Sequence, residues 1–300
     1  MEETEEVAYS TSPYDDCLAV NSDKKGILSM AKRRTARLVF DIESAADGDL
    51  ISKIRYPEEK LSPTEAIDRY RSELLEQNGK DFIPYTFQLP VSLVVATVAD
   101  DYSLIDLVAL DEEMSRPHEI VRLFWEGWRK NGQPQLVSFN GRGFDIPLLE
   151  VCAFRYGLSI PEWIAEKARS FEQPRNRFNS AAHLDLHEFL TNNGASRFVG
   201  GLSLAANLIG KPGKLDVAGH MVQDLWDGGR AREIHDYCRS DVLDTYFVYL
   251  RSRVVAGAIS LADEQSLIEA AHIWIQSKTA GSPGLARYLE AWGDWQSPWG

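Results

Sequence analysis

Apolar and polar residues follow one another along the first half of this chain in patterns typical of strands and helices. Residues 38–43 form a short apolar stretch that predicts a buried strand, although it contains two carboxylates. Residues 88–99 and 104–110 predict two further strands, and the turn-like acidic pair between them predicts a hairpin. Apolar residues at three- and four-residue spacing in 116–130 predict an amphipathic helix.

The second half predicts one more strand and then mostly helices. Residues 136–139 form a strand that leads through a glycine-containing turn at 140–143 into an apolar helix at 146–156. Further helices are expected at 63–76, where Ser62 would be the N-cap, and at 230–255, 266–275 and 285–292. Strands that alternate with helices in this order indicate an α/β sheet with helices packed on it.

Three regions of the chain differ in character. Residues 1–35 are polar and acidic, without sustained periodicity, and we expect a poorly ordered tail there. Residues 36–257 carry the pattern of a folded domain, and residues 258–300 are predicted to add a helical C-terminal extension.

At 300 residues, 44% of them hydrophobic, the chain is large enough for one substantial α/β domain, and three further features predict a cytoplasmic protein. Its longest apolar run is shorter than the roughly 20 residues that a membrane-spanning helix needs. The start of the chain is acidic, unlike a secretory signal, and the three cysteines are widely spaced, unlike a disulfide framework or a zinc site. We therefore expect a reducing compartment and no membrane.

The formal net charge of −13 looks unfavourable for a nucleic-acid partner, because phosphates are bound by Lys and Arg. The first 23 residues contribute acids and no Lys or Arg, whereas basic residues gather at 32–37 and 167–177. A metal-dependent nuclease must also carry a group of carboxylates. The acidic total therefore does not exclude nucleic acid.

Asp41 and Glu43 are the most informative residues of the first strand. Residues two apart on a strand project to the same face, so these like charges repel unless a cation lies between them. A hard divalent cation is the obvious candidate. The alternative is a strand that ends in a solvated acidic turn near Asp47-Gly48.

The glycine turn at 140–143 places Asp145 at the entrance of the following helix. Asp145 could therefore be an ordinary N-cap. Asn140, just past a strand, offers a donor and an acceptor to a ligand, or it is simply a turn residue.

Tyr237 and Asp241 lie four residues apart in the long helix and so share one face. A phenol and a carboxylate on an inward-facing stripe would be costly without partners. Asp244 is expected to face solvent or a neighbouring element. His235 is rotated about 120° from Asp241 and is expected on the helix surface.

Together, Asp41, Glu43, Asp145, Tyr237 and Asp241 resemble the metal-binding set of the DEDD superfamily of 3′-5′ exonucleases, in the subtype that uses tyrosine. The motifs are Asp-x-Glu at 41–43, Asn-x-x-x-Phe-Asp-x-Pro at 140–147 and Tyr-x-x-x-Asp at 237–241. The sequence is most similar to the predicted 3′-5′ exonucleases related to the proofreading domain of family B DNA polymerases, from about residue 38 to residue 257. That resemblance implies a ribonuclease H-like fold, a mixed sheet flanked by helices.

The resemblance also implies an enzyme that hydrolyses the terminal phosphodiester bond at the 3′ end of nucleic acid, expected to be single-stranded DNA, with two divalent ions, Mg²⁺ or Mn²⁺. Asp41 would bridge both ions, Glu43 and Asp241 would hold the nucleophile-side ion, and Asp145 would complete the shell of the second. Tyr237 would orient the attacking water.

Contacts with the substrate are expected from Asn140, Phe144, Lys211 and Lys214, although Phe144 could be core and the two lysines could form a solvated basic turn. His183 and Asp185 are interpreted as structural partners near the site. Arg175 and Arg177, interleaved with Phe171 and Phe178, suit either a single-strand track or an ordinary loop.

Two alternative functions remain open. One is an exoribonuclease or oligonucleotide hydrolase on the same fold, because contacts to a 2′-hydroxyl cannot be recognised in a sequence. The other is a catalytically inactive relative that binds nucleic acid, although none of the metal carboxylates is missing from this chain.

Overall fold

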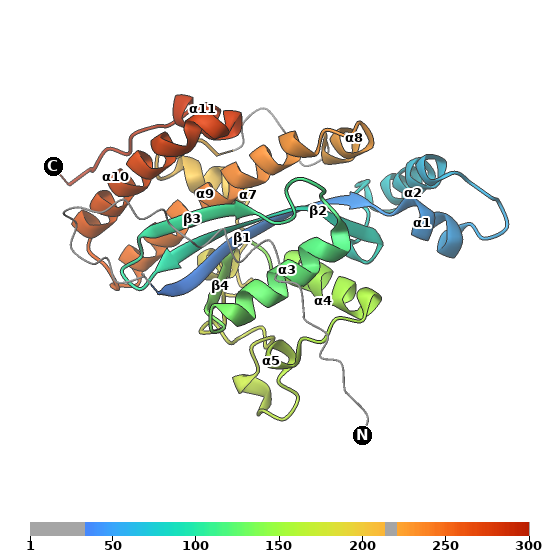
Figure 1. The fold of residues 1–300 in the computed structure, drawn as a ribbon, viewed down its shortest axis with the longest axis horizontal. Coiled ribbons are helices and arrows are strands. Elements are labelled where there is room, and N and C mark those ends of the chain that lie inside the picture. Colours follow the sequence, from blue (N-terminus) through green and yellow to red (C-terminus); the bar gives the residue numbers. More distant parts are fainter. Residues whose placement is uncertain (1–33, 214–220, 300) are drawn as a thin grey trace, which may run out of the picture. The chain divides into compact units, whose positions relative to one another are not determined.

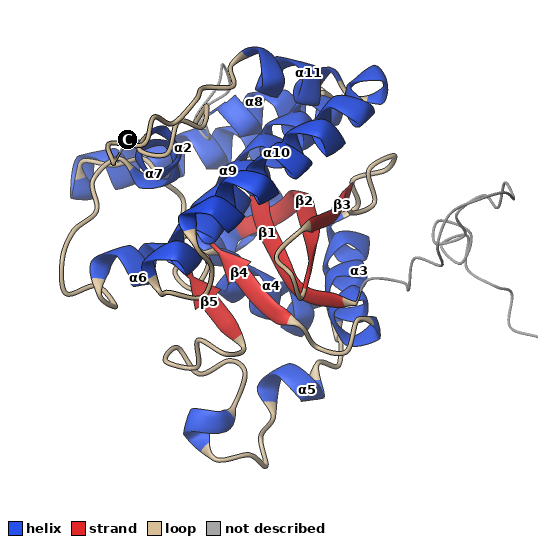
Figure 2. Cartoon of the chain, turned by 90° about the vertical axis from the view of Figure 1, so that its left-hand side faces the viewer, coloured by secondary structure: helices blue, strands red, loops and turns tan. Residues whose placement is uncertain are grey.

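The chain builds a five-stranded mixed sheet, in a computed structural model that describes residues 34–213 and 221–299. The strands are β1 (Thr35–Ala46), β2 (Gln88–Ala99), β3 (Leu104–Ala109), β4 (Gln135–Ser138) and β5 (His183–Asp185). Their order is β3-β2-β1-β4-β5 (Figure 2). The pairs β1–β2 and β2–β3 are antiparallel, whereas β1–β4 and β4–β5 are parallel.

Helices cover both faces of this sheet (Figure 1). Helices α3 (Pro117–Lys130) and α4 (Asp145–Tyr156) pack on one face, and the long helix α9 (Ala231–Val255) packs on the other. The predicted α/β fold class, a mixed sheet flanked by helices, is therefore confirmed.

Side chains of β1 alternate between the two hydrophobic cores. Val39 packs in the core under α9, whereas Phe40 and Ile42 pack in the core under α3 and α4. Because the side-chain period of a strand is two, Asp41 and Glu43 follow Val39 onto the α9 face. The two carboxylates thus extend a line of side chains that starts in the core.

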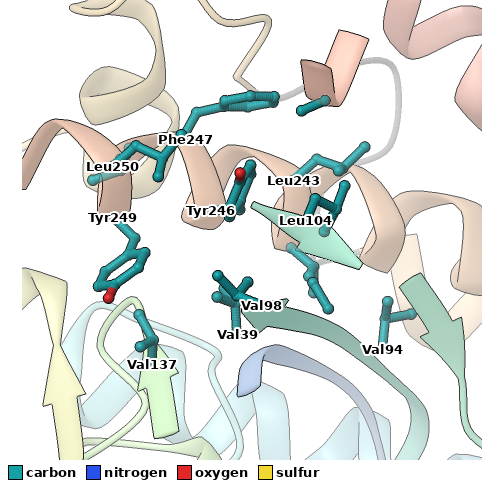
Figure 3. Packing of buried hydrophobic residues seen from close by; sticks show 14 of the residues in the cluster. Val39, Val94, Val98, Leu104, Val137, Leu243, Tyr246, Phe247, Tyr249 and Leu250 are labelled. Atoms are coloured by element: carbon teal, nitrogen blue, oxygen red, sulfur yellow. The ribbon is translucent and has the colours of Figure 1, made fainter. Parts of the chain in front are cut away.

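The core under α9 is dense and aromatic (Figure 3). Tyr246 and Tyr249 of α9 share this core with Val39 of β1 and Val137 of β4, and Figure 3 shows Tyr249 pointing toward Val137 and Phe247 on the opposite side of the helix. All of these side chains are almost completely buried. This packing fixes α9 against the two strands that carry or flank the candidate acids.

An insertion between β1 and β2 forms helices α1 (Gly48–Arg55) and α2 (Pro63–Asn78). Ser62 caps α2 with a capping box to Glu65, as its sequence predicts. Shorter helices occur elsewhere: α5 (Pro161–Ile164), α6 (Leu186–Thr191), α7 (Gly201–Asn207), α8 (Val222–Asp227), and the 3-10 turns Tyr85–Phe87, Ser170–Glu172 and Thr279–Gly281.

Residues 258–300, which were predicted to form a helical extension, contain α10 (Leu261–Lys278) and α11 (Pro283–Glu290), and both helices pack on α9 (Figure 1). Asp236 of α9 accepts hydrogen bonds from Gly284 N (3.1 Å) and Ser282 Oγ (3.3 Å) at the start of α11. Asp244 accepts a hydrogen bond from Tyr288 Oη at 2.7 Å. Asp244 therefore faces a neighbouring helix, one of its two expected environments.

Some predicted bounds change. The strand predicted at 38–43 runs from Thr35 to Ala46, because β2 is equally long and pairs with it throughout. The predicted tail lies outside the described residues except for Arg34 and Thr35, and Thr35 is already the first residue of β1. Among the helices in the described part of the chain, none is long and apolar enough to cross a bilayer.

Candidate active site

The candidate site lies where β1 and β4 separate. The parallel pairing of these strands joins Arg37 to Gln135, Leu38 to Leu136 and Val39 to Val137, and then it stops. Asp41 stands two residues beyond the last pair. In open α/β sheets, ligands bind at the carboxyl ends of strands where neighbouring connections diverge, and the acids of β1 occupy such a position.

Helix α9 brings a third carboxylate to this position. Oxygen atoms of Asp41, Glu43 and Asp241 all lie within 4.8 Å of one another. Tyr237 lies one turn earlier on α9 and is 7% exposed. The structure therefore brings together residues that are about 200 positions apart in the chain.

Two side chains, those of His235 and Cys238, hold this part of α9 against its neighbours. His235 is fully buried, and its ring nitrogens lie 2.9 Å from Ser115 Oγ and 2.8 Å from Ser92 Oγ. The expectation that His235 lies on the helix surface is wrong, because other elements cover α9 at that position. Cys238 Sγ lies 3.3 Å from the Asp41 carbonyl oxygen. These contacts fix the distance between β1 and the part of α9 that carries Tyr237 and Asp241.

Asp145 approaches the site from the other face of the sheet. It is the first residue of α4, and the N-cap position belongs to Phe144, so Asp145 is not the cap. Its Oδ1 accepts a hydrogen bond from the Ile42 backbone N at 3.1 Å. This bond ties Asp145 to the peptide between the two carboxylates of β1.

The local backbone explains how Asp145 reaches β1. Asn140 adopts a left-handed conformation with φ of 65°, which Asn tolerates better than most residues. A Cβ at Gly141 would collide with Ser138 Oγ and lie 3.3 Å from Asp145 Oδ2, so the turn requires glycine there. The sharp turn after β4 thus aims the first turn of α4 at the site.

Like charges dominate the electrostatics of the site. Burial, followed by the charges of Asp145, Glu43 and Asp241, raises the pKa of Asp41 well above its usual value. Burial also raises the pKa of Asp145 to about 7. The pKa of the Tyr237 phenol is raised by burial and by the neighbouring carboxylates. A cation bound among these oxygens would relieve the repulsion.

The donor set suits a hard divalent cation. Asp41, Glu43 and Asp241 offer carboxylate oxygens at short mutual separation, and Asp145 approaches the same stretch of β1. Mg²⁺ and Mn²⁺ prefer oxygen ligands, whereas zinc favours sites with His or Cys. The residues present therefore fit the divalent ions that the sequence motifs imply.

Asp185 and His183 support the turn after β4. Asp185 accepts hydrogen bonds from Asn140 N (2.9 Å) and Arg142 N (3.0 Å), and it also caps α6. His183 Nε2 lies 2.7 Å from Ser138 Oγ. Burial lowers the pKa of His183 to about 3, so its ring is neutral. The interpretation of both residues as structural partners is confirmed.

The candidate substrate contacts have different surroundings. Asn140 is exposed at the turn, and Phe144 is half-buried against the core under α3 and α4. Phe82, an exposed residue of the insertion, lies against Phe144 with ring centroids 5.6 Å apart. Phe82 was not predicted from the sequence, because its only local signal is an aromatic residue in a loop.

Lys211 requires a correction. Its side chain is only 4% exposed, and its Nζ lies 3.8 Å from the centroid of Trp292 and 5.4 Å from that of Phe247. Nζ also donates to the Gly293 carbonyl at 3.3 Å, and burial lowers its pKa to about 8. Lys211 is therefore neither a solvated basic turn nor available to a phosphate, and Lys214 lies outside the described residues.

The family of the chain follows from its sequence. A family model described as "Predicted 3'-5' exonuclease related to the exonuclease domain of PolB" matches residues 80–292. This protein belongs to that family. The matched region includes Asn140, Asp145, Tyr237 and Asp241, and it extends through α10 and α11, whereas Asp41 and Glu43 precede it.

Two other comparisons give less information about this protein than the family match does. A search of curated proteins finds no match. Among solved structures, the chain is similar to the family B DNA polymerase from the hyperthermophilic archaeon Pyrobaculum calidifontis, with 17% sequence identity and a TM-score of 0.44. That similarity covers 77% of this chain and 26% of the polymerase chain, so this member of the exonuclease family matches only about a quarter of the polymerase's length.

Proposed function

We propose that this protein is a 3′-5′ exonuclease that hydrolyses the terminal phosphodiester bond of single-stranded DNA with two divalent metal ions. The observation that carries the proposal is the convergence of Asp41, Glu43 and Asp241 within 4.8 Å of one another on the sheet side of α9. Membership of the family supports the reaction class. The proposal also includes the kind of nucleic acid, single-stranded DNA, and the number of metal ions, two.

The four carboxylates would share the ligand roles. Asp41 lies close to Glu43 and Asp241 and feels the charges of all three other acids, so it is the residue best suited to contribute to both ions. Glu43 and Asp241 would hold one ion. Asp145, anchored to Ile42 N through one oxygen, would contribute its second oxygen to the other ion. Bound Mg²⁺ or Mn²⁺ would supply the positive charge that activates water and stabilises the leaving 3′-oxygen.

Tyr237 would position the water that attacks the phosphorus. Its phenol can both donate and accept a hydrogen bond, and its helical position places it one turn from Asp241. The buried contacts of His235 with Ser92 and Ser115 hold this turn of α9 in place. Tyr237 thus acts from a rigid element, which favours precise orientation.

Asn140 and Phe144 would contact the terminal nucleotide. Asn140 is exposed at the end of β4, beside the turn that carries Asp145. The ring of Phe144 has one side against the core and lies beside the exposed ring of Phe82. An aromatic pair at this position offers a stacking surface for a base, whatever its identity.

The test is hydrolysis by purified full-length protein of single-stranded DNA and RNA, labelled at either end, with Mg²⁺. We expect stepwise release of mononucleotides from the 3′ end of DNA, inhibition by EDTA, and a loss of about 10²–10³-fold or more in Asp41→Asn. Asp106→Asn is the matched control, because Asp106 is an exposed carboxylate on β3. Activity that Asp41→Asn retains would overturn the proposed site. If the protein hydrolyses RNA in preference to DNA, the proposed substrate changes to RNA and the proposed reaction stays the same.

A further inference from the structure

An open pocket of about 540 Å³ lies at the β5 edge of the sheet. Its walls come from the turn after β4, the loop before β5, helix α6 and the C-terminal end of α9, and Figure 2 shows β5 and α6 at this edge. The lining includes three arginines from three of these segments, Arg142, Arg177 and Arg253. The family match assigns no role to this pocket, and the sequence left Arg177 and Phe178 of its lining open between a single-strand track and an ordinary loop.

The charge of the lining favours an anion. Arg142 Nε and Arg177 Nη2 lie 3.0 and 3.1 Å from the two carboxylate oxygens of Glu188, so one acid is shared by two guanidinium groups. Asp185 is occupied by backbone N–H groups of the turn and of α6. The described lining therefore has three positive and two negative charges, and both negative charges are already engaged. A local positive charge is notable in a chain whose net charge is −13.

Arg253 is the residue best placed to bind an incoming group. Its guanidinium lies 5.4 Å from the ring centroid of Tyr249 and 5.7 Å from that of Phe189. Its Nε donates to Ser252 Oγ at 3.2 Å. Within residues 34–213 and 221–299, neither Nη atom has a hydrogen-bond partner or a carboxylate within ion-pair distance. Arg253 is thus held by stacking while its two terminal nitrogens can bind a phosphate.

An exposed aromatic ring lies beside these cations. Phe178 is 71% exposed and lines the pocket, and the Arg177 guanidinium lies 5.2 Å from its ring centroid. Exposed aromatic rings next to cationic groups are the surfaces on which single-strand binding proteins stack bases. The lining of the pocket therefore offers cationic groups for a phosphate and, beside them, an aromatic ring for a base.

The pocket and the candidate active site share one turn. Arg142 lines the pocket, and Asp145 lies three residues later, at most about 11 Å along the chain. Asp185 also lines the pocket and fixes that turn through Asn140 N and Arg142 N. A strand whose 3′ end lies at the carboxylates can therefore reach the pocket with a nucleotide closer to its 5′ end.

We propose that this pocket binds a phosphodiester group of the substrate strand upstream of its 3′-terminal nucleotide, with Arg253 and Arg177 on the phosphate and Phe178 beneath a base. The proposal rests on the proposed exonuclease function, since it names a second subsite for the same strand. It makes Arg253 and Arg177 determinants of how strongly substrate length affects binding.

The test compares a long and a short substrate. The long one is single-stranded DNA of about 12 nucleotides, within the range that single-strand binding domains cover, and the short one is the p-nitrophenyl ester of thymidine 5′-monophosphate. We expect Arg253→Ala and Arg177→Ala to raise KM for the long substrate about 3- to 10-fold and to leave kcat and the short substrate unchanged. Each lost phosphate contact should reduce the salt slope of binding by about 0.7.

The matched control is Arg175→Ala. Arg175 belongs to the same loop as Arg177 but pairs with Glu150 at 2.7 Å and does not line the pocket. Arg253→Lys keeps the positive charge and should therefore recover part of the affinity that Arg253→Ala loses. This second variant separates loss of the phosphate contact from loss of folding. Circular dichroism of each variant checks that the fold is intact.

The outcomes separate this proposal from the proposed function. If the wild-type protein hydrolyses the long substrate and both arginine variants keep its KM and salt slope, the pocket proposal is overturned while the exonuclease stands. If the wild-type protein hydrolyses neither substrate but Arg253→Ala weakens binding of the long DNA, measured by fluorescence anisotropy, the exonuclease fails and the strand site stands. Tight binding of thymidine 5′-monophosphate alone, with no dependence on DNA length, would also overturn the pocket proposal.

Discussion

The molecule contains two kinds of buried or half-buried carboxylate, and they differ in what surrounds them. Glu264 of α10 receives Arg251 Nε at 2.8 and 2.9 Å, and Asp244 of α9 receives the Tyr288 hydroxyl at 2.7 Å. Asp41, by contrast, lies beside other carboxylates, and these neighbours raise its pKa.

The carboxylates that are paired with a donor contribute to the stability of the fold. The carboxylates that lie beside other carboxylates are explained by function. An acid that meets a donor is part of the folded framework, because a buried charge is tolerated when it is paired. An acid that meets other acids is costly unless a cation joins them. In this protein the two kinds occur on the same helix, since Asp241 and Asp244 are three residues apart.

The largest expected effect is a difference in stability between variants of the two kinds of carboxylate. Glu264→Gln should lower the free energy of unfolding by about 3 kcal/mol, because it leaves the partly buried Arg251 guanidinium without its carboxylate. Asp41→Asn should leave the free energy of unfolding unchanged or raise it in metal-free buffer, because it removes a repelled charge. Urea unfolding of both variants measures this. Equal destabilisation by the two substitutions would contradict the distinction.

The next effect concerns two buried tyrosines of α9. Tyr237→Phe should lower kcat about 10²-fold with little change in KM, as expected for loss of a group that positions the nucleophile. Tyr246→Phe is the matched control, because the Tyr246 hydroxyl donates to the Tyr102 carbonyl at 2.9 Å, in the turn between β2 and β3. The control should lose about 1 kcal/mol of stability and keep its kcat. Similar kcat values for Tyr237→Phe and the wild-type protein would remove Tyr237 from the mechanism.

A further effect is a dependence of stability on pH. Asp145 has a pKa of about 7 in the folded protein, above the value of about 4 expected for an unfolded aspartic acid. The folded state therefore holds a proton that the unfolded state releases, so Asp145 makes stability fall as pH rises from about 4 to about 7.

Denaturant unfolding in EDTA across that pH range measures this slope. The wild-type protein should lose stability relative to Asp145→Asn as pH rises through the window, and Mg²⁺ should reduce the loss at the upper end. A difference between the two proteins that is constant with pH would show that Asp145 is not strained in the absence of metal.

The sequence predicted much of this fold and site because short-range geometry sets both. The two-residue spacing of Asp41 and Glu43 and the four-residue spacing of Tyr237 and Asp241 determine which side chains share a face, and the structure keeps both pairs together. The capping box of α2 and the hairpin of β2 and β3 depend on equally local signals.

The errors arose where contacts come from distant segments. His235 is indeed turned away from Asp241, but helix α9 has few exposed positions, because the sheet covers one side and α7, α10 and α11 cover others. Lys211 looked like a basic turn because Trp292, which packs on it, lies 81 residues later. No local pattern could indicate either environment.

Direct measurement of metal binding tests the central claim, that the acids gathered at Asp41 form a divalent-cation site. Calorimetric titration of metal-free protein with Mn²⁺ at a pH above the pKa of Asp145 is the experiment. The account predicts binding of two ions per chain in the wild-type protein and in Asp106→Asn, and strongly weakened binding in Asp41→Asn. Mn²⁺ binding of equal strength in all three proteins, or hydrolysis of DNA without any Mn²⁺ or Mg²⁺ binding, would contradict it.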